Sequence, residues 1–142
     1  MISIRLSAVL RTLPLKEGMR VLEIGCGPGV LARAIINQIG DGFVLGIDRS
    51  DKAIQQAIKN STLEIQSGKL AFKKIAIENF KHHANKPLFD LAVAIRVGAL
   101  DGRHPELAQK AFTNIASLLK KNGRLFIDGP DIIQEINLTK YK

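Results

Sequence analysis

The stretch Glu23-Ile24-Gly25-Cys26-Gly27-Pro28-Gly29 sets three glycines after a short apolar run and before a helical pattern. The preceding run, RVLEIG at Arg20–Gly25, is typical of a buried parallel strand. Glycines at such a strand end permit a tight turn and let a ligand approach the backbone closely. The following helix offers free backbone N–H groups and the positive end of its dipole. The stretch therefore predicts a strand–loop–helix site for a carboxylate or a phosphate.

A second signal stands where such a site needs it. Asp48 ends the next apolar run, FVLGID at Phe43–Asp48, 19 residues after Gly29. A carboxylate at the end of that strand can accept hydrogen bonds from a ribose diol, which favours a nucleotide-like ligand. The alternative interpretation is a structural turn followed by a helix-capping aspartate.

Strand-like and helix-like segments alternate along the rest of the chain. The expected strands are Arg20–Gly25, Phe43–Asp48, Lys69–Ile77, Phe89–Arg96 and Arg124–Asp128, and the expected helices are residues 2–13, 29–39, 50–60 and 105–120. This alternation predicts an α/β fold with an open, mostly parallel sheet and right-handed crossovers. The lysines of Lys69–Ile77 suit an edge strand. A length of 142 residues predicts a single domain, residues 1–142.

Composition excludes several classes of protein. Cys26 is the only cysteine, which excludes a disulfide scaffold and a cysteine-rich structural zinc site, and we expect no metal. No run approaches the roughly 18 apolar residues of a spanning helix, and the N-terminus lacks a secretion signal. We therefore expect no membrane association and a reducing, cytoplasmic setting.

The net charge of +8 arises from 21 basic and 13 acidic residues. Such a field can attract nucleic acid or acidic ligands. The excess is spread along the chain, however, and only seven aromatic residues are present, with no tryptophan to build a stacking platform. A solvated, lysine-rich surface is the favoured interpretation, and a nucleic-acid partner stays an unfavoured alternative.

The exact spacing of the glycines carries a family resemblance. A dinucleotide fingerprint needs a third glycine at position 30, which is Val30, and this counts against a nicotinamide dehydrogenase. The segment VLEIGCGPG instead resembles the first motif of class I S-adenosylmethionine-dependent methyltransferases. GIDRSDKAI resembles their second-strand acid with its helix, and LKKNGRLFIDGP resembles their passage into the fifth strand. The resemblance extends from about Lys16 to Pro130.

The resemblance implies a Rossmann-like three-layer sandwich with strand order 3-2-1-4-5 and helices on both faces. It further implies methyl transfer from S-adenosylmethionine, with S-adenosylhomocysteine as product, and we expect a small-molecule acceptor. Two alternatives stay open: a catalytically weak cofactor-binding module or subunit that needs a partner, and an RNA or protein methyltransferase. The amino-group tetrad N/D-P-P-Y/F and the Pro-Cys pair of cytosine methylation are both absent after the fourth strand.

The resemblance also implies roles for individual residues. Those that would wrap the methionine part of the cofactor are Glu23, Gly25, Cys26, Gly27, Pro28 and Gly29. Asp48 would bind the ribose hydroxyls, Arg49 would sit beside the adenine, and Ile77 would meet the adenine edge through its backbone. Many relatives carry an acid just before that last position, where this chain has Ala76, so Glu78 is the expected substitute.

Residues after the fourth and fifth strands are the candidates for substrate chemistry. Arg96 would lie beside the methyl donor and point toward substrate or a carboxylate, or else form a surface ion pair. His104 is the first candidate for a general base, with a simple helix start as the alternative, and Asp128 is the second. Cys26 is expected to be a small loop residue rather than a nucleophile.

The C-terminal part departs from the family pattern. Only 12 residues follow Pro130, so family strands 6 and 7 are not expected. Asp131–Ile136 would form a short helix and Asn137–Lys142 at most a frayed strand. The fifth strand would then present a bare edge, which a second copy or another protein would cover. At the other end, residues 1–15 would form a helix that in relatives often closes over the cofactor.

Overall fold

The computed structural model describes residues 2–142, and Met1, the first residue of the expected lid segment, lies outside them. The helices are α1 (Ile4–Thr12), α2 (Val30–Ile36), α3 (Asp51–Lys59), α4 (Thr62–Gln66) and α5 (Pro105–Leu118), with short 3-10 turns η1 (Ile77–Asn79) and η2 (Thr139–Tyr141). The strands are β1 (Arg20–Ile24), β2 (Phe43–Asp48), β3 (Leu70–Lys74), β4 (Phe89–Ala94), β5 (Leu119–Asp128) and β6 (Ile133–Ile136).

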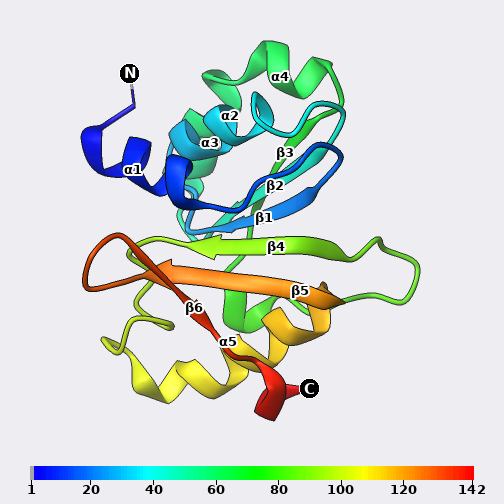
Figure 1. Ribbon diagram of the computed structural model, residues 1–142. Coiled ribbons are helices and arrows are strands. Elements are labelled where there is room, and N and C mark those ends of the chain that lie inside the picture. The colour runs from blue at the N-terminus through cyan, green and yellow to red at the C-terminus, as the bar shows by residue number, and fades with distance from the viewer. Residues whose placement is uncertain (1) are drawn as a thin grey trace.

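The described strands form one sheet in the order β3-β2-β1-β4-β5-β6. The pairings among β1 to β5 are parallel, and β6 is antiparallel to β5. Figure 1 shows α1 to α4 on one side of the sheet and α5 on the other. The expected Rossmann-like sandwich and the order 3-2-1-4-5 are confirmed, and β3 is the edge strand that its lysines indicated.

Two apolar layers separate the sheet from its helices. One layer joins the sheet to α5, with Leu22, Ile115 and Leu125 almost inaccessible to solvent. The other joins it to α1 and α2, with Val9 and Ile35 fully buried. The predicted helix and strand faces pack as expected because the strands of a sheet covered on both sides must be apolar throughout.

The strand count is a correction. Asp131–Ile136 was expected as a helix, but Ile133–Ile136 pairs with Leu125–Asp128 as β6. The reason is non-local: β5 would otherwise leave a row of unpaired backbone groups, and a tight turn returns the chain alongside it. The edge of β5 that the sequence seemed to leave for a second copy or a partner is therefore covered by the chain itself (Figure 1).

The passage from α5 into β5 is a second correction. The helix ends at Leu118 rather than at residue 120, and Leu119 already pairs with Phe89. Arg124 pairs with Leu91, so residues 120–123 bulge out opposite Asp90. A hydrogen-bonded ion pair of 2.9 Å between Lys120 Nζ and Asp90 Oδ1 bridges the bulge. The Asn-Gly pair at 122–123 thus marks a bulge in a strand and not the end of a helix.

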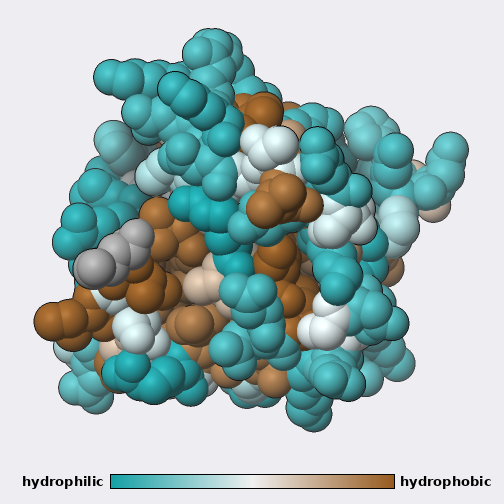
Figure 2. Space-filling model, turned by 90° about the horizontal axis from the view of Figure 1, so that it is seen from above, coloured by the Kyte–Doolittle hydropathy of each residue, from teal (hydrophilic) through white to brown (hydrophobic). Residues whose placement is uncertain are grey.

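Helix α1 lies beside the carboxyl ends of the strands. Val9 and Leu13 anchor it to the core, whereas Ile4 is 90% exposed. Seen from above, the surface is mostly hydrophilic, with hydrophobic surface gathered on the side where α1 lies (Figure 2). Among the described residues, no helix is long and apolar enough to cross a membrane.

Candidate functional site

The loop after β1 turns sharply at the carboxyl end of the sheet. Gly25 has φ 72° and Gly29, the residue before α2, has φ 87°, which is left-handed backbone that favours glycine. A Cβ on Gly25 would lie 2.8 Å from Val97 Cγ2. The amides of Gly25 and Cys26 both donate to the carbonyl of Ile47, at 2.8 and 2.9 Å. The loop is thus held against the end of β2.

The Asp48 carboxylate fixes the same loop from the next strand. Its Oδ2 accepts from the Gly27 amide at 2.9 Å, and its Oδ1 accepts from the Ser50 amide at 2.9 Å. Asp48 is half-buried and lines a cavity, and each of its oxygens has acceptor capacity beyond the one backbone bond it accepts. Ser50 caps helix α3, because its hydroxyl accepts a hydrogen bond from the Ala53 amide. The interpretation of Asp48 as a mere helix cap is therefore not supported.

A cavity of about 240 Å³ opens at the carboxyl ends of the strands. Seven residues that the sequence proposed for the site line it: Gly25, Asp48, Arg49, Ile77, Glu78, Arg96 and His104. The lining also includes residues that the sequence did not propose for cofactor contact: Ile24, Ile47, Ile75, Ala76, Val97, Gly98, Ala99, Arg103 and Leu107. Cys26, Gly27, Pro28 and Gly29 form the loop beside it, outside the lining.

Glu23 is a buried acid beneath the glycine loop. Glu23 is only 5% exposed, and its Oε1 has no hydrogen-bond partner among the described residues. Burial raises the pKa of Glu23 to about 8, and the nearby Asp48 carboxylate adds to the rise. The Ala32 amide and the Arg33 guanidinium lower the pKa by less. A cationic group of a ligand could supply the hydrogen bond that this carboxyl oxygen lacks.

Cys26 is inert in this setting. It is 5% exposed, and burial raises the pKa of its thiol, with the Glu23 and Asp48 carboxylates adding to the rise. A thiol that stays protonated is a poor nucleophile. Its place in the loop matches the expected role of a small, packed residue. Within residues 2–142, no group of three or more metal-ligating side chains is gathered.

The segment after β3 is held from the opposite helix. Ile77 is buried in η1, and its carbonyl accepts a 3.0 Å hydrogen bond from Asn114 Nδ2 of α5. Asn114 is itself 5% exposed. The sequence did not single out Asn114, although an asparagine within the apolar stripe of a helix was a usable signal. This bond sets the position of Ile77 and Glu78 in the cavity wall.

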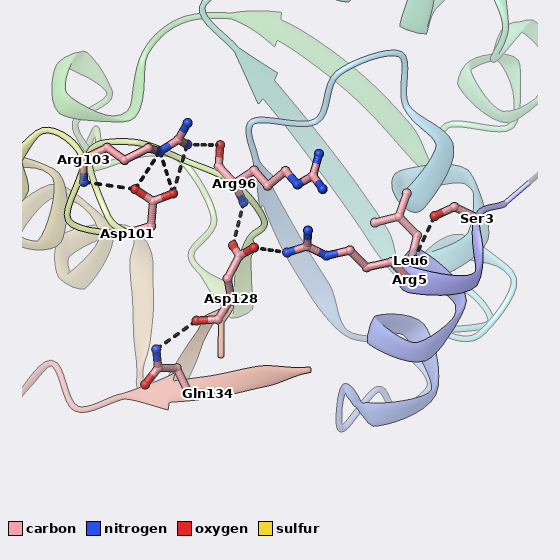
Figure 3. A network of polar contacts seen from close by, with 8 residues as sticks. All are labelled: Ser3, Arg5, Leu6, Arg96, Asp101, Arg103, Asp128 and Gln134. Carbon is pink, nitrogen blue, oxygen red and sulfur yellow. Dashed lines mark hydrogen bonds and ion pairs between the residues drawn. The ribbon is translucent and has the colours of Figure 1, made fainter. Parts of the chain in front are cut away.

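The backbone of Arg96 is clamped in a strained conformation after β4. Arg96 has φ 60°, the one positive φ among the described non-glycine residues. Its amide donates to Asp128 Oδ1 at 2.6 Å, and its carbonyl accepts from the Arg103 guanidinium at 2.8 Å. Arg103 is in turn paired with both oxygens of Asp101, at 3.0 and 2.9 Å (Figure 3). The clamp shapes the wall that carries Arg96 and Val97.

Asp128 does more than end β5. Besides the Arg96 amide, its carboxylate pairs with the Arg5 guanidinium of α1, and its carbonyl accepts from Gln134 Nε2 of β6 at 2.8 Å (Figure 3). Asp128 is not among the residues that line the cavity. It therefore ties together α1, the loop after β4 and β6, and its contacts are those of a residue that positions others.

His104 precedes the first turn of α5 and reaches the cavity. Its side chain is 56% exposed, and Nδ1 lies 3.4 Å from Glu106 Oε1. The ring packs over Gly98, where a Cβ would meet His104 Cδ2 at 2.5 Å. His104 occupies the N-cap position of α5, directly before Pro105. Its side chain makes no capping hydrogen bond to the helix. His104 thus stands at the start of α5 and also lines the cavity, so its place in the structure fits both interpretations.

Comparison with known proteins agrees with this geometry. A family model described as a methyltransferase domain matches residues 15–141. The chain belongs to this methyltransferase domain family. The mitochondrial ubiquinone biosynthesis O-methyltransferase of Dictyostelium discoideum is 28% identical over an alignment of 121 residues, and the match covers 81% of this chain and 36% of that protein. The ribosomal protein L11 methyltransferase of Thermosipho melanesiensis is 27% identical over 125 residues, 88% of this chain and 43% of that protein.

Solved structures of methyltransferases share the fold. A S-adenosylmethionine-dependent methyltransferase from Thiobacillus denitrificans, in complex with S-adenosylhomocysteine, superposes with a TM-score of 0.68 at 20% identity. The match covers 89% of this chain and 48% of that one. The chain thus spans less than half the length of these three methyltransferases. The resemblance to class I methyltransferases is confirmed.

The buried acid makes stability depend on pH. Between pH 4.5, the ordinary pKa of a glutamate, and about 8, native Glu23 keeps a proton that the unfolded chain has lost. The free energy of unfolding therefore falls as pH rises through this window. Glu23→Gln cannot ionise, so we expect its stability relative to wild type to be at least about 1 kcal/mol more favourable at pH 8.5 than at pH 5. Urea denaturation at both pH values measures this.

The matched control for that measurement is Glu17→Gln, which changes an exposed carboxyl. Its stability difference from wild type should stay flat over the same range. An equally flat difference for Glu23→Gln would contradict a buried, protonated Glu23.

The strained backbone of Arg96 gives a second expectation. Arg96→Gly and Arg96→Ala both remove the guanidinium, but alanine keeps a Cβ at φ 60°. We expect Arg96→Gly to be more stable than Arg96→Ala by about 1 kcal/mol, because left-handed backbone costs an L-residue roughly that amount. Chemical denaturation of the two variants tests it, and equal stability would show that this backbone is unstrained.

Proposed function

We propose that this chain binds S-adenosylmethionine in the cavity at the carboxyl ends of the strands and transfers its methyl group to a small-molecule acceptor. The observation that carries the proposal is the arrangement of two acids around one glycine loop. Asp48 holds the loop through the Gly27 amide and faces the cavity, and Glu23 lies beneath it with an orphaned oxygen. A dinucleotide site would have a third glycine at position 30, where this chain has Val30, and it would not need the buried acid.

The residues present fit such a cofactor. The Asp48 carboxylate has lone pairs free for ribose hydroxyls after its two backbone bonds. Glu23 would hold the cationic amino group of the methionine part and ionise as it did so. Arg49 and the Ile77–Glu78 segment line the part of the cavity expected for the adenine, with Leu107 adding apolar surface. The amides of Gly25, Cys26, Gly27 and Gly29 are all hydrogen-bonded within the chain, so the loop would meet the methionine part through its glycine surface beside the cavity.

When bound, the cofactor supplies an electrophilic methyl group on a sulfonium. The chain's own contribution is alignment, since in-line displacement gains much of its rate from proximity. Arg96 and His104 line the cavity where the acceptor would enter, and His104 is our candidate to take a proton from the acceptor. We assign Asp128 a positioning role, because it holds the Arg96 amide and the Arg5 guanidinium.

Helix α1 is the candidate lid. The Arg5–Asp128 ion pair holds it at the carboxyl ends of the strands, and its exposed Ile4 offers apolar surface on the same side. A small acceptor suits a site closed by one short helix. Relatives are named for both a small-molecule and a protein acceptor, so RNA or protein acceptors are tested beside small molecules.

Cofactor binding is tested first, by thermal unfolding with S-adenosylhomocysteine. At about 100 times its dissociation constant, a ligand stabilises by roughly 2.7 kcal/mol, which corresponds to about 5–11 °C in Tm for a chain of this size. We expect Asp48→Asn to lose most of this shift, because an amide has one acceptor oxygen where the site uses two. The exposed Asp51→Asn should keep the shift, and NADH should give none.

A full shift in Asp48→Asn would contradict the ribose role, and no shift in the wild type would contradict the proposed cofactor. Binding without any turnover would instead favour the cofactor-binding module.

The role of His104 is tested by turnover. Release of S-adenosylhomocysteine is screened with small hydroxyl, amine and thiol acceptors beside peptide and RNA acceptors. With an active acceptor, His104→Gln should lower kcat by about 100-fold, the usual contribution of a general base, with the thermal shift unchanged. Lys110→Gln, an exposed change in α5 outside the lining of this cavity, is the control. An unchanged kcat would exclude His104 as the base, and turnover confined to peptide or RNA would exclude a small acceptor.

A further inference from the structure

A second cavity, of about 320 Å³, opens at the opposite end of the sheet. Arg20, Phe43 and Phe89, the first residues of β1, β2 and β4, all line it. The other lining residues are Leu45, Lys73, Phe80, Lys81, His82, His83, Lys86, Pro87 and Leu118. None of them belongs to the cavity proposed for the cofactor. We call this space the amino-end cavity.

The crossover between β3 and β4 explains why the space exists. Residues 75–88, all described, contain the three-residue turn η1 and otherwise no helix. At the amino end of this sheet face, residues of the loop 80–88 and Leu118, the last residue of α5, line the cavity. Arg20, Phe43 and Leu45 consequently stay half-exposed on a face that is buried elsewhere.

The walls of the amino-end cavity combine rings with cations. The Arg20 guanidinium carbon lies 4.7 Å from the Phe43 ring centroid and 5.3 Å from that of Phe89. Arg20 Nε is buried and has no hydrogen-bond partner among residues 2–142. Lys73 Nζ lies 5.2 Å from the Phe80 ring centroid. Ring faces thus contribute to holding these cations.

The positive charge here is not neutralised from within. The described lining residues include Arg20 and the lysines 73, 81 and 86, and none of the lining residues is acidic. The carboxylate whose charge acts on Arg20 is Asp90, which lies outside the lining, accepts the Arg20 backbone amide at 2.8 Å and is paired with Lys120 at 2.9 Å. An anion is therefore the group that this cavity lacks.

We propose that the amino-end cavity is a binding site for a small anionic ligand with an aromatic body, such as an aryl carboxylate, sulfonate or phosphate. The Phe43, Phe80 and Phe89 rings and Leu118 would pack on the aromatic body. Arg20 and the lysines of the rim would bind the anionic group.

The test uses a matched pair of probes on the whole chain. The first is 1-anilinonaphthalene-8-sulfonate, and the second is N-phenyl-1-naphthylamine, which has the same rings without the sulfonate. We expect saturable binding of one sulfonate probe per chain by fluorescence, and binding of the neutral probe weaker by about tenfold. Amide chemical shifts in ¹⁵N NMR should move in residues 80–88 and at Phe43, with little change at Gly25 and Asp48.

Two variants make the test specific. Lys73→Ala combined with Lys86→Ala removes two exposed rim cations and should weaken the sulfonate probe by about fivefold. Lys52→Ala combined with Lys59→Ala removes two exposed lysines from α3 and should leave the affinity unchanged. Phe80→Leu should weaken both probes, because it removes a ring and not a charge.

The proposal is overturned if the two probes bind equally, if the rim variant binds as wild type does, or if the shifts map to other residues. Displacement of the probe by a single-stranded oligoribonucleotide, with affinity that falls steeply with salt, would overturn it in favour of a nucleic-acid surface.

Discussion

The hydrogen bonds that join the end of β1 to the end of β2 are the constraint on which the site depends. A loop that turns out of a buried parallel strand leaves amides that need acceptors. The Ile47 carbonyl takes two of them, and the Asp48 carboxylate takes the Gly27 amide. The same carboxylate faces the cavity, so one side chain both builds the loop and presents acceptors to a ligand. The spacing from Gly29 to Asp48 is therefore set by the structure of the loop as well as by any ligand.

Two costs are concentrated around this cavity. Glu23 is a carboxyl buried with an orphaned oxygen, and Arg96 is held with left-handed backbone. Each costs stability, and strain of this kind persists only where neighbouring structure fixes it. Asp128 and Arg103 supply that fixing for Arg96. Arg96 lines the cavity, and Glu23 lies beside it beneath the glycine loop, so both costs stand next to the proposed cofactor site and favour a site kept at some expense of stability.

The sequence predicted what local patterns determine. The alternating strand-like and helix-like runs predicted a mostly parallel sheet, and the resemblance to class I methyltransferases implied its strand order. Asp48, Arg49 and Arg96, which stand at or just after the ends of predicted strands, line one cavity. What it missed depends on contacts between distant segments. β6 forms because it pairs with the open edge of β5, and the bulge at residues 120–123 is set by the pairing of β5 with β4. Helix α4 has no buried residue, so its sequence shows no hydrophobic periodicity. Asn114 within the apolar stripe of α5 was a usable signal, but its partner, the Ile77 carbonyl, lies 37 residues away in the sequence and could not be predicted from local patterns.

The two cavities lie at opposite ends of one sheet face, and β1 shows how they are kept apart. Side chains alternate along a strand, so Arg20, Leu22 and Ile24 share a face. Arg20 lines the amino-end cavity, Ile24 lines the other, and Leu22 between them is fully buried. The segment after β3 touches both, since Ile77 lines one cavity and Phe80 the other. The Phe80 amide donates to the Ile77 carbonyl at 3.1 Å. A ligand that packed on Phe80 would therefore contact the same turn that carries Ile77, without sharing an atom with the proposed cofactor site.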